Sequence, residues 1–186
     1  VNADKDNPDG SHYAYYVALR QGDTVGLCTF ACDQPRYLAP VKGSGQLNKL
    51  LNAVYDLDTT RRAADYQAAA NQLLARQKRR ALVIIVTNLR DEDDEDLLTA
   101  VKRISRQHRV LVASLREEVL DQVRQAPVQT LPEALAYCGS VDYLNAREEL
   151  HDRMKAQGLA VFFSLPSDLG ADLVTRYLGW KKAGVL

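Results

Sequence analysis

The chain has 186 residues, 46% of them hydrophobic and 26% charged, and its 24 basic side chains equal its 24 acidic ones. This length and composition fit a single domain over residues 1–186 that buries one core without disulfides or a structural metal. The balanced charge provides no overall field toward nucleic acid or an anionic membrane, so no nucleic-acid partner is predicted. No apolar run approaches the roughly 20 residues of a transmembrane helix, so we expect no membrane insertion of this segment.

The first part of the chain predicts helices and short strands in alternation. A first helix ends at Gly22, and residues with strand preference occupy 24–30 and 36–39, where flanking prolines confine the second run to an edge. Apolar residues then recur at i, i+3, i+4 and i+7 in two helices, over 47–55 and from 66 onward. The second helix ends in the basic run 76–80, interpreted as a solvated helix end that suits the helix dipole rather than a phosphate site.

The apolar run Leu82–Val86 is followed by Thr87 and Asn88. An uninterrupted β-branched run of this kind is typical of a strand covered on both faces, as in the middle of a parallel sheet. Ligands of such sheets gather outside the carboxyl ends of the strands. Function is therefore expected at Thr87, Asn88 and the acidic turn that follows them.

The remaining elements continue the alternation. We predict a helix over 97–104, a strand over 109–113, a helical stretch over 119–123, a long helix over 132–157, a strand over 159–163 and a helix over 169–178. Strands that alternate with helices imply right-handed crossovers. The predicted fold class is α/β: a doubly wound, mostly parallel central sheet with helices on both faces, of the Rossmann type.

Catalytic patterns are scarce in the sequence. None of the three histidines stands beside a serine or cysteine in a nucleophile motif such as Gly-x-Ser-x-Gly. Cys28 and Cys32, four residues apart in one predicted strand, would be separated by about 13 Å, so we expect all three cysteines to be buried free thiols.

Several ordered motifs resemble the bacterial family known as domain of unknown function 58. They are the run Tyr16–Leu27, Gly43-Ser44-Gly45-Gln46-Leu47 with Leu50-Leu51, Asp65-Tyr66, Arg79–Val83, Thr87-Asn88-Leu89, His108–Val112 and Arg176-Tyr177-Leu178. The resemblance implies a von Willebrand factor A-like domain that partners a MoxR-type AAA+ ATPase. It further implies a cytoplasmic location, with a full-length protein anchored to the inner membrane by preceding helices.

The same resemblance implies a metal-ion-dependent adhesion site, which this sequence matches poorly. The family fold begins with a central strand ending in Asp-x-Ser-x-Ser, whereas here the serine pair is absent and residues 1–10 look irregular. We expect the place between the strands at 24–30 and 82–86 to be filled, either by Val1 to Asp4 as the remnant of that strand, which is the leading choice, or by a segment from another chain. The weak metal candidates are Asp4, Asp6, Asp65 and Asn88, the last a neutral amide where a carboxylate would be expected. The site is therefore predicted to be degenerate, with no cofactor and no bound magnesium.

Two functions from different classes remain open. The leading hypothesis is a non-enzymatic protein-interaction module that serves a MoxR-type ATPase. The alternative is a magnesium-dependent hydrolase that uses the strand-end carboxylates Asp33, Asp65 and Asp91, because fold alone does not settle function.

A partner surface is predicted at the carboxyl ends of the strands, since parallel strands all end on the same side of a sheet. The residues expected on it follow the strands or lie between the two central helices: Asp33, Gln34, Arg61, Arg62, Asp65, Asn88, Arg90, Asp91, Arg116 and Glu117.

Overall fold

A computed structural model describes residues 11–32, 35–43, 45–55, 64–88, 94–116 and 118–186. Its centre is a parallel sheet of three strands, β3 (Leu82–Thr87), β4 (Arg109–Leu115) and β5 (Ala160–Ser164), in that order. β4 is the middle strand, and its residues 110–115 are all buried. The register pairs Thr87 with Ser114 and Leu115 with Ser164, so the three carboxyl ends lie side by side.

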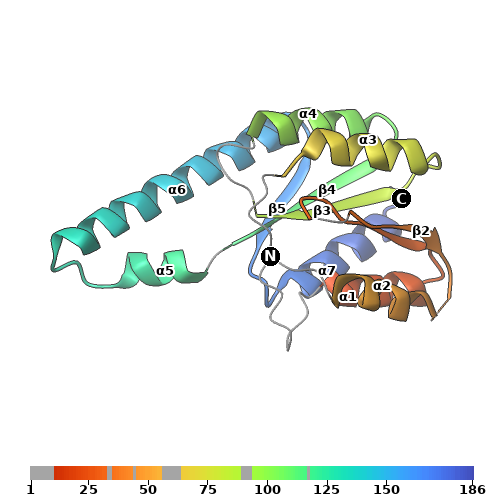
Figure 1. Ribbon diagram of the computed structural model, residues 1–186, viewed down its shortest axis with the longest axis horizontal. Helices are drawn as coiled ribbons and strands as arrows, with labels where there is room; N and C mark the ends of the chain where they lie inside the picture. The colour runs from red at the N-terminus through yellow and green to blue at the C-terminus, as the bar shows by residue number, and fades with distance from the viewer. Residues whose placement is uncertain (1–10, 33–34, 44, 56–63, 89–93, 117) are drawn as a thin grey trace.

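Helices cover both faces of this sheet (Figure 1). On one face, α3 (Tyr66–Arg76), α4 (Asp94–Ser105) and the second half of α6 (Leu131–Ala156) pack against β4 and β5. On the other face lie α1 (Ser11–Arg20) and α7 (Leu169–Lys182), which bury side chains against the opposite side of the same strands. The helical periodicity in the sequence therefore identified real buried faces, and the α/β class with a parallel sheet is confirmed.

A second, two-stranded antiparallel sheet consists of β1 (Val25–Cys28) and β2 (Tyr37–Val41). The helix that follows it, α2 (Gly45–Tyr55), buries Leu50 and Gln46, and the Gln46 amide donates to the Val25 carbonyl at 3.1 Å. A Cβ on Gly26 would lie 2.6 Å from the Leu38 carbonyl oxygen, so only glycine allows the irregular pairing at this point.

β1 is expected from the sequence to lie in the central sheet, one place away from β3. In the described part of the chain β1 pairs with β2 and not with β3. Val1 to Asp4, the expected occupant of the place between β1 and β3, lie outside the described residues, so the intervening strand stays a prediction.

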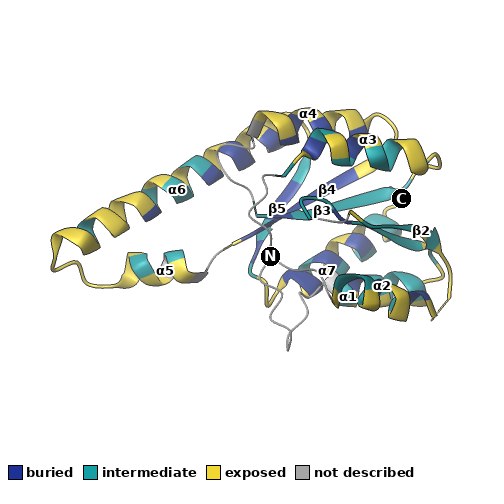
Figure 2. Ribbon diagram, in the orientation of Figure 1, coloured by how far each residue is buried: buried dark blue, intermediate teal, exposed yellow. Residues whose placement is uncertain are grey.

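The last feature is a helical hairpin formed by α5 (Glu118–Gln125) and the first half of α6. It extends away from the sheet in Figure 1, and Figure 2 shows that it is mostly exposed, whereas the second half of α6 buries one of its faces. Cys138 lies on this exposed part, so the expectation that all three cysteines are buried is wrong, although all three are free. Within the described ranges, no helix combines the length and the apolar character needed to cross a membrane.

Candidate functional site

Three small hydroxyl side chains end the three parallel strands. Thr87 closes β3, Ser114 lies one residue before the end of β4, and Ser164 closes β5. All three are buried, and the register places them at the same edge of the sheet. This carboxyl edge is where ligands of open α/β sheets gather, which makes it the first candidate site.

Each of these hydroxyls is engaged by a side chain from a different helix. The hydroxyls of Thr87 and Tyr66, the first residue of α3, are 2.8 Å apart. Arg147 of α6 donates from Nη2 to Ser114 Oγ at 2.6 Å. Ser164 Oγ donates to Asp172 Oδ2 of α7 at 2.7 Å. The three contacts attach three helices to the strand ends, so these hydroxyls have a structural use that accounts for their presence.

Arg147 is the most unusual member of this edge because its side chain is only 2% exposed. Its Nη2 also donates to the Leu115 carbonyl, and its guanidinium lies over the rings of Tyr143 and Phe163, at 5.5 and 5.4 Å. Its Nε and Nη1 have no hydrogen-bond partner, and among the described residues no carboxylate pairs with it. A buried cation is therefore held by carbonyl, hydroxyl and aromatic contacts alone, at the end of the central strand.

The predicted partner surface can be examined at three residues. Asp65 precedes α3, Asn88 follows β3 and Arg116 follows β4, so all three lie at the carboxyl edge. The Arg116 backbone N–H donates to the Ser164 carbonyl at 2.9 Å, which extends the pairing of β4 with β5. The other predicted members lie outside the described residues: Asp33, Gln34, Arg61, Arg62, Arg90, Asp91 and Glu117.

Of the four residues suggested for metal binding, Asp65 has a structural role, Asn88 follows β3, and Asp4 and Asp6 lie outside the described ranges. Asp65 caps α3, since its Oδ1 accepts from the Ala68 backbone N–H at 2.8 Å. Asp4 and Asp6 fall in the part that is not described. In the described part no group of three or more histidine, cysteine, aspartate or glutamate side chains could hold a metal ion.

Two histidines are buried, and neither lies in a catalytic arrangement with the strand-end hydroxyls. Burial lowers the pKa of His151, which stacks on Phe163 at 4.4 Å between ring centroids, and nearby Lys155 lowers it further. Burial also lowers the pKa of His108, partly offset by a backbone contact to Gln77. Both side chains are expected to be neutral at pH 7 and to act as packed core residues.

The projecting hairpin, which follows β4 at the carboxyl edge of the sheet, forms a second candidate surface. It exposes five large apolar side chains, namely Val119, Val128, Leu131, Leu135 and Tyr137, of which Leu131 is 73% and Leu135 65% exposed. A capping box fixes the start of α6: Glu133 Oε2 accepts from the backbone N–H groups of Gln129 and Thr130, each at 2.8 Å. Leu131 and Leu135 therefore project from a helix start that is fixed by hydrogen bonds.

Sequence reasoning missed Ser114, Ser164, Arg147 and the hairpin surface. The two serines could have been found, since each directly follows an apolar run, as Thr87 does. Arg147 carried no such signal because an arginine in a long helix is normally solvated.

Taken together, the parallel strands, the helices on both faces and the strand-end contacts define an α/β domain with its candidate site at the carboxyl edge of the sheet. The model of the family described as "Protein of unknown function DUF58" matches residues 13–157, most of the chain, and the protein belongs to that family. Comparison with curated proteins gave no match, and neither did comparison with solved structures.

Proposed function

We propose that this domain is a non-enzymatic protein-interaction module that docks a MoxR-type AAA+ ATPase through the carboxyl edge of its sheet and the adjoining α5–α6 hairpin. The observation that carries the proposal is the exposure of large apolar side chains on the hairpin. Contiguous exposed apolar residues on a folded domain mark protein-binding surfaces, because leaving them in water gives up their burial energy.

The position of the hairpin supports the same proposal. It leaves the sheet directly after Arg116, so the hairpin begins at the same edge of the sheet at which Asp65 and Asn88 lie. An apolar centre with a polar, charged rim is the usual composition of a protein interface. The partner class comes from the resemblance to von Willebrand factor A-like domains, whose doubly wound fold and degenerate adhesion site are part of this proposal.

The competing hydrolase receives less support. Of its three carboxylates, Asp33 and Asp91 lie outside the described residues, and Asp65 already caps α3. The strand-end hydroxyls that could have served as nucleophiles are bonded to Tyr66, Arg147 and Asp172.

The test is a titration of the domain with the MoxR-type ATPase from the same genome. The double variant Leu131→Ser and Leu135→Ser should weaken the complex at least tenfold, because two exposed anchors are removed. Arg116→Glu should weaken the complex more at low salt than at high salt, because salt screens the attraction between charges on the rim of an interface. Tyr55→Ser is the matched control, because Tyr55 is an equally exposed apolar residue on α2, and it should leave the affinity unchanged.

Two outcomes would contradict the proposal. One is a folded hairpin double variant that binds the ATPase as tightly as the wild type. The other is an equal loss with Tyr55→Ser, which would indicate nonspecific apolar adhesion rather than docking at the hairpin.

A further inference from the structure

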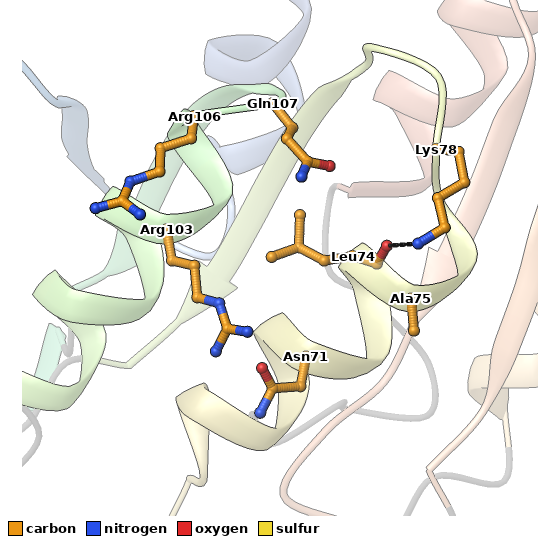
Figure 3. A pocket seen from close by; sticks show the side chains of 7 residues that line it. All are labelled: Asn71, Leu74, Ala75, Lys78, Arg103, Arg106 and Gln107. Atoms are coloured by element: carbon orange, nitrogen blue, oxygen red, sulfur yellow. Dashed lines mark hydrogen bonds between the residues drawn. The ribbon is translucent and has the colours of Figure 1, made fainter.

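A cavity of about 400 Å³ lies between the carboxyl-terminal ends of α3 and α4 (Figure 3). Both helices lead from here into the first residues of β3 and β4, so the cavity is at the amino edge of the sheet, opposite the proposed docking surface. It is lined by side chains from both helices and from the short segments that follow them.

The lining is strongly basic. Lys78, Arg103 and Arg106 contribute three positive charges, and none of the described residues that line the cavity is acidic. Lys78 donates to the Leu74 carbonyl at 2.8 Å, the contact expected of a lysine at a helix end. Neither Arg103 nor Arg106 forms a hydrogen bond or ion pair within the described part of the chain, and both side chains are exposed.

The helix dipoles neutralise only part of this positive charge. Each helix carries about −0.5 of an elementary charge at its carboxyl end, so α3 and α4 together neutralise about one of the three positive charges. An excess of about +2 remains in one concave site. Like charges that line one pocket repel one another, so a bound anion would stabilise the site.

We propose that this cavity binds the phosphate group of a phosphate monoester. A monoester carries nearly two negative charges at neutral pH, which matches the excess, and the guanidinium groups of Arg103 and Arg106 have the donor geometry that phosphate oxygens prefer. The amides of Asn71 and Gln107 add neutral donors on opposite sides of the cavity, and the Leu74 side chain provides an apolar wall for the organic part of the ester (Figure 3).

The size of the cavity supports a small ligand. Its volume of about 400 Å³ falls inside the range of about 300–1,000 Å³ that is typical of small-molecule sites. The phosphate monoester can belong to a free metabolite or to the headgroup of a lipid such as phosphatidic acid, and both would present the same oxygens.

The experiment measures binding of inorganic phosphate by chemical shift changes in amide NMR spectra at constant ionic strength. The backbone of Ala75 and the side-chain amide of Gln107 should shift saturably. The double variant Arg103→Gln and Arg106→Gln should weaken binding at least tenfold. The control Arg79→Gln and Arg80→Gln removes the same charge from exposed residues outside the lining and should change the affinity less than threefold.

A second arm identifies the source of the phosphate by sedimentation with phosphatidylcholine vesicles that contain 20% phosphatidic acid. Vesicle capture that is lost only in the Arg103/Arg106 variant supports the proposal with a lipid headgroup as the source. Phosphate binding without vesicle capture supports it with a free monoester. Equal losses in both double variants, or no saturable shift at the cavity in the wild type, would overturn the proposal.

Discussion

The two halves of α6 should respond in opposite ways to the same substitution. Leu150 is 1% exposed and packs in the core beneath α4, whereas Leu135 is 65% exposed on the hairpin. Both are leucines inside one helix, so replacing either by alanine changes helix propensity equally. The difference between the two variants therefore isolates the contribution of packing.

Truncating a buried leucine removes its transfer energy and leaves a cavity, which together cost about 2–5 kcal/mol. Taking about 3 kcal/mol, and about 2–4 °C per kcal/mol for a domain of this size, Leu150→Ala should lower the Tm by about 6–12 °C. Leu135→Ala should stay within about 0.5 kcal/mol of the wild type, as surface substitutions do.

The assay is urea and thermal unfolding of both variants, repeated at two protein concentrations tenfold apart. If Leu135→Ala destabilises the domain as much as Leu150→Ala does, Leu135 is packed against something in solution. The reasoning that the hairpin is a free apolar surface would then be refuted. A concentration dependence of that loss would identify self-association as the cause.

Three further outcomes are expected. Millimolar magnesium should leave the Tm unchanged, because Asn88 supplies no charge where a carboxylate is needed, and a rise of several degrees would show a ligand that stabilises the folded state. The free energy of unfolding should fall as the pH drops below about 6.5, because burial lowers the pKa of His108 and His151 and the unfolded chain then takes up protons that the folded chain refuses; His108→Gln should flatten this slope in urea titrations. Burial raises the pKa of Asp23, but hydrogen bonds, first from Lys181, outweigh burial and lower the pKa from its usual value of 3.8. The stabilisation of the folded state by the Asp23 carboxylate is therefore present at neutral pH and lost in acid. Asp23→Asn should lower the free energy of unfolding by about 0.2–1 kcal/mol in low salt and by less in high salt.

The periodicities in the sequence predicted the elements well because most of them bury one face. The predicted strand over 82–86 matches β3 to within one residue, and the predicted helix over 97–104 lies inside α4. β4 is two residues longer than its predicted range of 109–113, because Ser114 and Leu115 continue the pairing with β5 even though a serine interrupts the apolar run. The length of β4 depends on its pairing with the neighbouring strand, and the local sequence of β4 does not show where that neighbour ends.

The same limit explains why neither the apolar surface of the hairpin nor the basic cavity was predicted. Apolar residues at helical spacing, such as Leu131 and Leu135, normally indicate a buried face, and the sequence does not show that this part of α6 passes beyond the sheet. The basic cavity depends on Lys78 and Arg103, which come from segments about 25 residues apart. Each segment alone resembles a solvated helix end, and only the packing of α3 beside α4 brings their charges together.

Arg147 connects the core to the hairpin. Removing a guanidinium from water costs several kcal/mol, so its burial is stable only because its contacts with Ser114, Leu115 and the two aromatic rings compensate that cost. Those contacts fix α6 against the end of the central strand. At about 1.5 Å per residue, the helix then carries Leu131 about 24 Å from this anchor. An apolar surface held by one continuous helix loses little conformational freedom when a partner binds, so more of its burial energy contributes to affinity.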